Sequence, residues 1–227
     1  MNKIDKDGFR WYQTPNELEL PSSTTIIDCI QHKGLKNWFI NSSANKVKTV
    51  QTTTADTGNL IHEYAEQIVR GDAPKNIRHD LEYIMHEFYT WWEVFNDTHD
   101  VHVSRTEQPL HCYKYGYAGT CDMVLKVDGV IEIWDWKSGS VKVNAGWQLA
   151  SYVMAYEEMF NVTVGGMRVV QISAKYETIK EFKYEHLEFC KRAFLHSLQA
   201  WKALYFGMLK KQKYPYLLKD PFELREE

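Results

Sequence analysis

Apolar residues recur along the chain with two different periods. A period of about 3.6 residues, typical of helices with one buried face, predicts helices over residues 52–71, 77–95, 144–160 and 185–210. Runs rich in β-branched and aromatic residues, bounded by turn residues, predict strands over residues 101–109, 121–127, 130–136, 167–174 and 178–184. Before these elements, the sequence predicts a hairpin over residues 9–20 and helices over residues 23–32 and 35–40. We expect an α/β (α+β) fold.

The two strands over residues 121–136 form the best-defined hairpin of the chain. Asp128 and Gly129 join them, and this dipeptide supplies the positive φ angles that a two-residue hairpin turn needs. Acidic residues interrupt both apolar runs: Asp122 lies near the start of the first strand, and Asp135 lies near the end of the second, two residues before Lys137. These carboxylates need an explanation other than packing.

Strand alternation places Asp135 and Lys137 on one face of the second strand, and Trp134 and Trp136 on the other. Carboxylates on paired strands repel each other unless a cation lies between them, and carboxylate oxygens suit Mg²⁺ or Mn²⁺. A lysine beside them can hold and polarise water, which indicates metal-assisted hydrolysis of a phosphodiester. A structural ion pair explains the same residues equally well, so the hairpin alone leaves both interpretations open.

Two further elements carry candidate residues for this site. Gly58, His62 and Glu66 lie four residues apart and share one side of the helix over residues 52–71. The glycine allows close backbone approach, and the imidazole of His62 either binds a metal or makes an ordinary hydrogen bond beside an apolar face. Glu107, in the preceding strand, either orients the site or faces solvent.

Amide and hydroxyl groups form another set of candidates. Gln148 and Tyr152 lie one helical turn apart and direct an amide and a phenol toward the end of the hairpin. Ser22 or Ser23 can cap the helix that follows, and hydroxyls at a helix start, Thr24 included, can also bind phosphate. Capping is the simpler interpretation.

Length and charge narrow the classes of protein. The 227 residues, 44% hydrophobic and 25% charged, suit one globular domain. Within it we expect an N-terminal hairpin and helices (1–50), a core (51–184) and a closing helix and tail (185–227). The formal net charge is −3, so nucleic-acid binding requires a local basic groove rather than a positive field over the whole surface. The chain has no apolar run of about 18 residues, so we expect no membrane partner and a cytoplasmic location. The sequence leaves the oligomeric state open, and a monomer is the favoured state.

The four cysteines are too scattered for a clustered metal site. No Cys-x-x-Cys pair occurs among Cys29, Cys112, Cys121 and Cys190. This spacing argues against a zinc ribbon and an iron–sulfur cluster, and we expect four free thiols.

Taken together, five motifs resemble those of the PD-(D/E)XK nucleases in order and approximate spacing. The motifs are Gly58-x-x-x-His62, Glu107, Gly119-Thr-x-Asp122, Asp135-Trp-Lys137 and Gln148-x-x-x-Tyr152. The resemblance spans roughly residues 10–160 and is closest to the RecB-like branch, which includes the RecB nuclease domain, CRISPR-adaptation nucleases and the mitochondrial genome maintenance exonuclease. The segment Pro21–Ile26 is similar to a motif of the last group and its phage relatives. The resemblance implies a restriction-endonuclease-like core, with a mixed central β-sheet flanked by helices and an N-terminal helical elaboration.

The resemblance also implies a metal centre. His62, Asp122 and Asp135 would bind Mg²⁺ or Mn²⁺ together with the backbone carbonyl of Trp136, and Lys137 would position the attacking water. Some relatives carry a four-cysteine iron–sulfur cluster, but this chain lacks the three clustered cysteines that would follow the core, so we expect no cluster.

The remaining matched residues are assigned to orientation and DNA binding. Glu107 matches the family's glutamate before the hairpin, and the accessory motif helps to hold the site and the nucleic-acid backbone. The residues expected to contact DNA are Ser22, Ser23, Thr24, Gly58, Gln148 and Tyr152.

The implied activity is that of a metal-dependent DNA exonuclease. It would hydrolyse phosphodiester bonds from DNA ends, with a preference for single strands, in replication, recombination or repair, and a small phage or bacterial protein would fit. Trp11, Trp38 or Tyr117 either stack unpaired bases or lie in the core. The alternatives are a structure-specific endonuclease of the same fold and a non-catalytic, nucleic-acid-binding recombination accessory protein.

Overall fold

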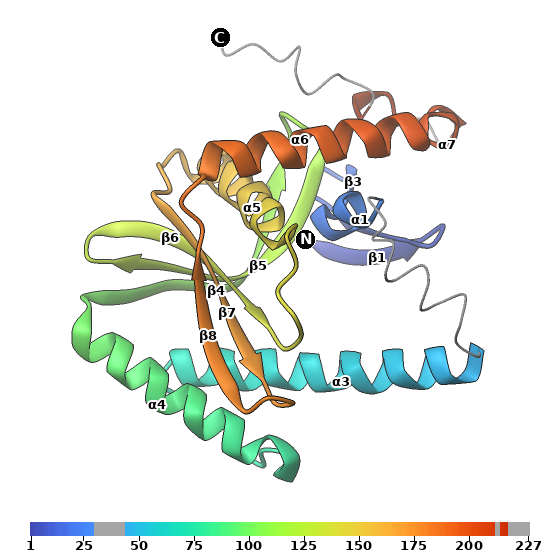
Figure 1. Cartoon of the computed structure of the whole chain (residues 1–227). Coiled ribbons are helices and arrows are strands. Elements are labelled where there is room, and N and C mark those ends of the chain that lie inside the picture. The colour runs from blue at the N-terminus through green and yellow to red at the C-terminus, as the bar shows by residue number, and fades with distance from the viewer. Residues whose placement is uncertain (30–43, 212–213, 218–227) are drawn as a thin grey trace.

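A five-stranded mixed sheet forms the centre of the protein (Figure 1). The computed structural model describes residues 1–29, 44–211 and 214–217. In sheet order, the strands are β4 (Val101–Cys112), β5 (Tyr117–Val127), β6 (Val130–Lys137), β7 (Gly166–Ser173) and β8 (Thr178–Lys183). Neighbouring strands are antiparallel except β6 and β7, which are parallel and are connected through α5 (Ala145–Phe160).

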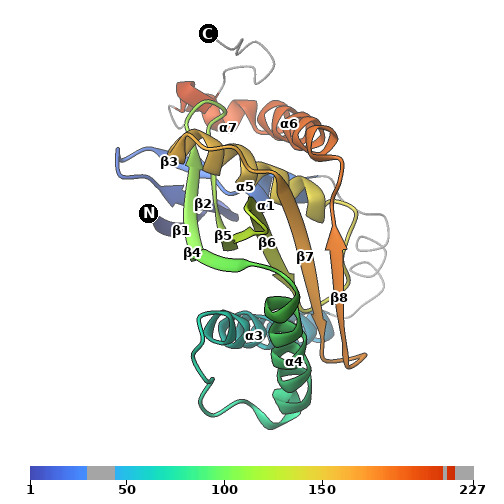
Figure 2. The same cartoon turned by 90° about the vertical axis from the view of Figure 1, so that its left-hand side faces the viewer.

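Helices cover both faces of this sheet (Figures 1 and 2). Helices α3 (Ala44–Val69) and α4 (Glu82–Thr98) lie on one face, while α5 and α6 (Leu187–Leu204) lie on the other. Each layer has its own hydrophobic cluster: Trp134 and Trp136 pack toward α3 and α4, whereas Ile133 packs toward α5 and α6. The α/β class and the mixed sheet flanked by helices are therefore confirmed.

The N-terminal segment forms a second sheet rather than a single hairpin. Its strands are β1 (Asn2–Lys6), β2 (Phe9–Gln13) and β3 (Glu19–Pro21). Strand β1 was not predicted because its residues are mostly polar. A signal was present in Asp7 and Gly8, whose φ angles of 56° and 78° form the same kind of turn as Asp128 and Gly129.

Several helix boundaries differ from those predicted. Helix α1 (Ser23–Asp28) ends earlier, and the helix expected over residues 35–40 lies outside the described residues. The closing helix is divided at Tyr205 into α6 and α7 (Phe206–Lys211), since the helix end at this residue has non-helical backbone angles. Single-turn 3₁₀ helices precede α4 at His79–Leu81 and follow α7 at Pro215–Leu217.

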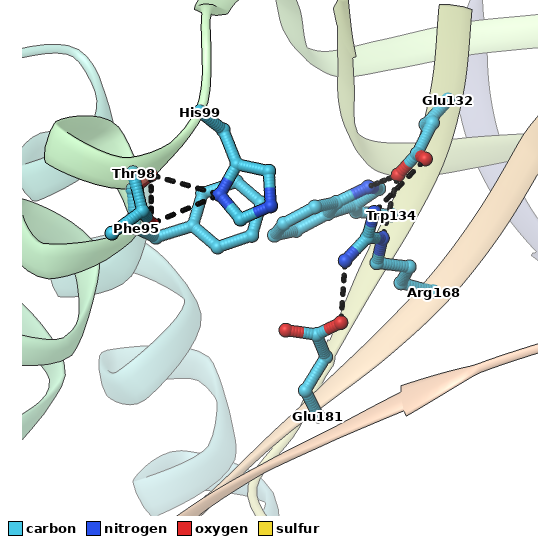
Figure 3. Close-up of polar contacts among 7 residues, drawn as sticks. All are labelled: Phe95, Thr98, His99, Glu132, Trp134, Arg168 and Glu181. Atoms are coloured by element: carbon cyan, nitrogen blue, oxygen red, sulfur yellow. Dashed lines mark hydrogen bonds and ion pairs between the residues drawn. The ribbon is translucent and has the colours of Figure 1, made fainter. Parts of the chain in front are cut away.

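Buried charges connect β6, β7 and β8 on the face that α4 covers (Figure 3). Arg168 donates to both carboxylate oxygens of Glu132 at 2.7 and 3.1 Å, and to Glu181 at 2.5 Å. The indole N–H of Trp134 donates to the same Glu132 at 2.7 Å. The guanidinium also lies 5.1 Å from the ring centroid of Trp134 and 5.5 Å from that of Phe95. Each buried charge is thus paired, and the network holds the parallel strands β6 and β7 together behind the candidate site.

No helix in the described part of the chain combines the length and the apolar character needed to cross a membrane.

Candidate active site

The candidate site forms where the alternation of side chains along β5 breaks down. Cys121 and Met123 are two residues apart, yet they belong to hydrophobic clusters on opposite faces of the sheet. The pairing of β5 with β6 ends where Met123 faces Trp134. Two residues further along β6, the backbone N–H of Trp136 donates to Asp122 Oδ2 at 2.7 Å. The Asp122 side chain therefore bridges two strands at the point where their backbones separate.

Strand β4 is irregular at the same level. The residues on either side of Glu107 pair with those on either side of Asp122, so these two acidic residues lie opposite each other. Glu107 has a φ of 44°, a left-handed conformation that costs a residue with a side chain on the order of 1–2 kcal/mol. This strained backbone coincides with the point where the Glu107 carboxylate approaches that of Asp122.

Helix α3 brings an imidazole to this pair of carboxylates. His62 Nδ1 lies 3.3 Å from Asp122 Oδ2. One turn earlier, a Cβ atom on Gly58 would lie 3.0 Å from Ser138 Oγ, so the glycine lets the helix approach the loop after β6 closely. Gly58 therefore allows close backbone approach of the helix, as the sequence indicated.

Glu66 anchors the same helix to β4. It accepts a hydrogen bond from Thr106 Oγ1 at 2.7 Å and pairs with Arg70 at 2.8 Å, and Arg70 donates to the same threonine at 2.7 Å. Because Thr106 precedes Glu107, these contacts fix the distance between His62 and Glu107.

One donor atom each from His62, Glu107 and Asp122 lies within 4.8 Å of the others. Burial and the charge of Asp122 raise the pKa of Glu107. Burial also acts to raise the pKa of Asp122, but His62 and Lys137 outweigh it and lower the pKa. Burial acts to lower the pKa of His62, and Asp122 outweighs it, so this pKa is raised. Two negative oxygens and one nitrogen on three separate elements are a donor set for a divalent cation.

Asp135 faces a lysine rather than this donor group. Its carboxylate forms an ion pair with Lys137, whose Nζ also donates to Gln148 Oε1 at 3.1 Å. Gln148 Nε2 donates to the Tyr152 hydroxyl at 2.8 Å and lies 3.5 Å from Asp135 Oδ1. The accessory pair therefore reaches the hairpin end, as its helical spacing predicted. In the described residues the tight donor group contains Glu107, whereas the resemblance implied Asp135, so the ligand role of each stays a prediction.

Burial governs the electrostatics of the lysine pair. Asp135 is 2% exposed, and burial raises its pKa to about 6. Burial acts to lower the pKa of Lys137, but Asp135 and Asp122 outweigh it, so the ammonium form is favoured.

The residues at the start of α1 have partners within the protein. Ser22 Oγ accepts a hydrogen bond from the Thr25 backbone N–H at 3.0 Å, which is the predicted cap. Ser23 donates to the Ala118 carbonyl at 3.2 Å. A role of Ser22, Ser23 and Thr24 in DNA binding stays a prediction.

All of the predicted site residues except Trp136 line one pocket of about 840 Å³. The Trp136 side chain is buried on the opposite face, and its carbonyl as a metal ligand stays a prediction. Trp11 and Tyr117 are fully buried, which supports the core interpretation, and Trp38 lies outside the described residues.

Sequence reasoning missed the part of the pocket formed by the N-terminal sheet. Lys3, Arg10 and Tyr12 line it. Lys3 pairs across the strands with Tyr12, and Arg10 pairs with Asp5, so these positions share one face of the sheet. The Tyr12 hydroxyl contacts Thr120 Oγ1 at 3.1 Å, which fixes this sheet against β5. Recognition of Asp7 and Gly8 as a hairpin turn would have predicted β1 and, with it, the contribution of the N-terminal sheet to the pocket.

We expect the raised pKa of Asp135 to make the free energy of unfolding of the metal-free protein depend on pH. Because the folded-state pKa of about 6 lies above the ordinary value of 3.8, the folded protein binds this proton more tightly than the unfolded chain. The contribution of Asp135 to the free energy of unfolding therefore falls as the pH rises from about 4 to about 6, by about 3 kcal/mol in total.

Urea unfolding in a chelating buffer, with wild type and Asp135→Asn compared at each pH, isolates this term. The wild-type value minus the variant value should decrease across that range. A difference that stays constant with pH would show that the Asp135 pKa is not raised.

Comparison with known proteins supplies the family. The sequence profile described as the PD-(D/E)XK nuclease superfamily matches residues 35–215, well over half of the chain. A search of curated proteins finds no significant match. Membership of the superfamily implies a nucleic-acid substrate and divalent-metal chemistry, and the donor group of His62, Glu107 and Asp122 fits a divalent metal. The chain belongs to the PD-(D/E)XK nuclease superfamily.

Proposed function

We propose that this protein is a Mg²⁺- or Mn²⁺-dependent DNA exonuclease that degrades single strands from their ends in replication, recombination or repair. The observation that carries the proposal is the approach of His62, Glu107 and Asp122 to within 4.8 Å of one another in the pocket that also contains Lys137. The RecB-like branch is part of this proposal, and the order of the five sequence motifs supports it.

The donor set suits the proposed metal. Carboxylate oxygens suit Mg²⁺ and Mn²⁺, and the imidazole of His62 adds a nitrogen that a transition ion accepts readily. His62, Glu107 and Asp122 would hold the ion, and the predicted ligands Asp135 and the Trp136 carbonyl would complete its shell. When bound, a divalent cation stabilises the negative charge that develops on a phosphate under attack.

Lys137 is the residue best placed to orient the attacking water. An ammonium has three N–H donors, and Asp135 and Gln148 accept two of them. The third donor can hold a water oxygen toward the pocket. Gln148 ties Lys137 to Tyr152, so the ammonium is held from two sides and little side-chain freedom is lost during the reaction.

The shape and charge of the pocket support a single-stranded end as substrate. Residues of α3 and of the N-terminal sheet both line the pocket, which has a volume of about 840 Å³. Lys3 and Arg10, on that sheet, line the same pocket and offer positive charge to a phosphate. Lys3 also lies near enough to Glu107 to act on the pKa of that carboxylate.

We also propose the cytoplasm as the location, because all four cysteines are free thiols. A structure-specific endonuclease of the same fold and a non-catalytic accessory protein are the alternatives. The compact donor group weighs against the second alternative, because binding alone does not need it.

We expect Asp122→Asn to reduce DNA cleavage to background, because it removes a charged metal ligand. The same carboxylate accepts a hydrogen bond from the Trp136 N–H. Lys137→Gln should lower the cleavage rate by about 10²- to 10⁴-fold, since the water loses its donor. The assay follows end-labelled single- and double-stranded DNA, at both label positions, with Mg²⁺, with Mn²⁺ and with chelator.

Matched controls lie at the far end of the same hairpin. Asp128→Asn and the exposed Lys126→Gln make the same chemical changes outside the pocket and should cleave like wild type. Equal, metal-independent products from wild type and the two site variants would refute the nuclease proposal.

A circular single-stranded DNA of the same sequence separates exonuclease from endonuclease. We expect the circle to stay intact while its linearised form is degraded to short products, because the proposed enzyme requires an end. Both substrates are analysed by gel electrophoresis. Conversion of the circle to linear DNA would identify an endonuclease instead.

A further inference from the structure

A mostly apolar groove of about 460 Å³ lies where α5, the end of β8 and the start of α6 meet. We call it the aromatic groove and define it by Val143, Trp147, Tyr184 and Phe189. Nothing in the proposed chemistry uses these residues.

The aromatic groove lies close to the candidate active site. Tyr184 and Lys137 are close enough that each affects the pKa of the other. A Cβ atom on Gly146 would lie 2.7 Å from two Tyr184 ring carbons, so the ring rests on the first turn of α5, two residues before Gln148. A smaller pocket of about 210 Å³, lined by Lys137, Gln148 and Lys142 among others, lies along the same helix start.

The side chains of the aromatic groove offer rings and apolar surface to a ligand. Val143 is 75% exposed and Phe189 is 68% exposed, whereas Trp147 and Tyr184 are half-buried against the core. A half-buried ring is held in place and presents a fixed face, so little conformational entropy is lost when a flat group stacks on it.

Lysines accompany these rings. Lys142 lies in the smaller pocket and Lys183 in the aromatic groove, and neither makes an ion pair within the described residues. Two carboxylates, Asp28 and Glu185, also line these two pockets, so the surface is mixed rather than strongly positive. Stacking rings with a few cations suit unpaired nucleobases on a phosphate backbone, for which stacking supplies most of the affinity.

We propose that the aromatic groove binds unpaired bases of the substrate strand that lie next to the phosphate held beside Lys137. This inference rests on the proposed function for the identity of the strand. Its occupant is argued from the rings of the groove, from the proximity of Tyr184 to Lys137, and from Lys183 in the groove and Lys142 in the smaller pocket. If the groove binds bases in this way, the affinity for a long strand depends on residues that take no part in the chemistry.

The test compares exposed substitutions, so that folding is preserved. Phe189→Ala removes a ring, and Val143→Glu adds a negative charge to the aromatic groove. The matched controls, Tyr83→Ala and Val94→Glu, make similar changes on α4 at side chains that are each 56% exposed and lie outside the groove. Phe189→Tyr keeps an aromatic ring and serves as the rescue.

The readouts are the Kd for a 20-nucleotide oligothymidine in chelator, by fluorescence anisotropy, and KM and kcat on the same strand with metal. We expect Phe189→Ala and Val143→Glu each to raise Kd and KM about tenfold with kcat unchanged. The rescue and both controls should bind like wild type. Unchanged Kd and KM in both groove variants would overturn the proposal.

Other outcomes are also decisive. If wild type cleaves no DNA with either metal, the proposed function fails, and the binding measurement in chelator decides the aromatic groove on its own. If Phe189→Ala alters the sedimentation coefficient of the protein and leaves the oligothymidine Kd unchanged, the groove is a contact between copies of this chain and the inference is wrong.

Discussion

The hydrogen bond from the Trp136 backbone N–H to Asp122 Oδ2 is the contact on which the candidate site depends. Strands β5 and β6 pair normally as far as Met123 and Trp134, and beyond that point a side chain, not a backbone, joins them. This separation lets a carboxylate lie within the sheet without taking a place on either hydrophobic face. The opposite residue, Glu107, reaches the same region through a left-handed backbone, so two irregular strands together create one acidic centre.

The two faces of β6 divide stability from chemistry. On one face, Trp134 and Trp136 pack against α3 and α4, and the buried Arg168 neutralises Glu132 and Glu181 (Figure 3). On the other face, Asp135 and Lys137 pair at the edge of a pocket. The packed face fixes the strand, and this rigidity allows costly buried charges to be held on the polar face.

Local rules explain which parts of this arrangement could be predicted. The Asp128-Gly129 turn sets the hairpin register, and strict alternation then separates Asp135 from Trp134, so both were correct from sequence. Helical spacing likewise placed His62 beside Gly58, and Gln148 beside Tyr152.

Non-local geometry explains what was missed. The backbone of Glu107 is left-handed although its residue type disfavours that conformation, and no local pattern indicates it. Strand β1 is polar on the face that borders the pocket, so Lys3 gave no apolar signal. The approach of Glu107 to Asp122 and His62 was also outside the reach of sequence, because these residues lie on β4, β5 and α3.

The central claim is that irregularities in β4 and β5 gather His62, Glu107 and Asp122 into a divalent-metal site. The most direct measurement is anomalous X-ray scattering from crystals of the protein soaked in Mn²⁺. The account predicts one strong manganese peak with His62, Glu107 and Asp122 among its ligands, and no such peak in Asp122→Asn crystals treated identically. A wild-type crystal without a peak there, or with manganese bound only at other residues, would contradict it.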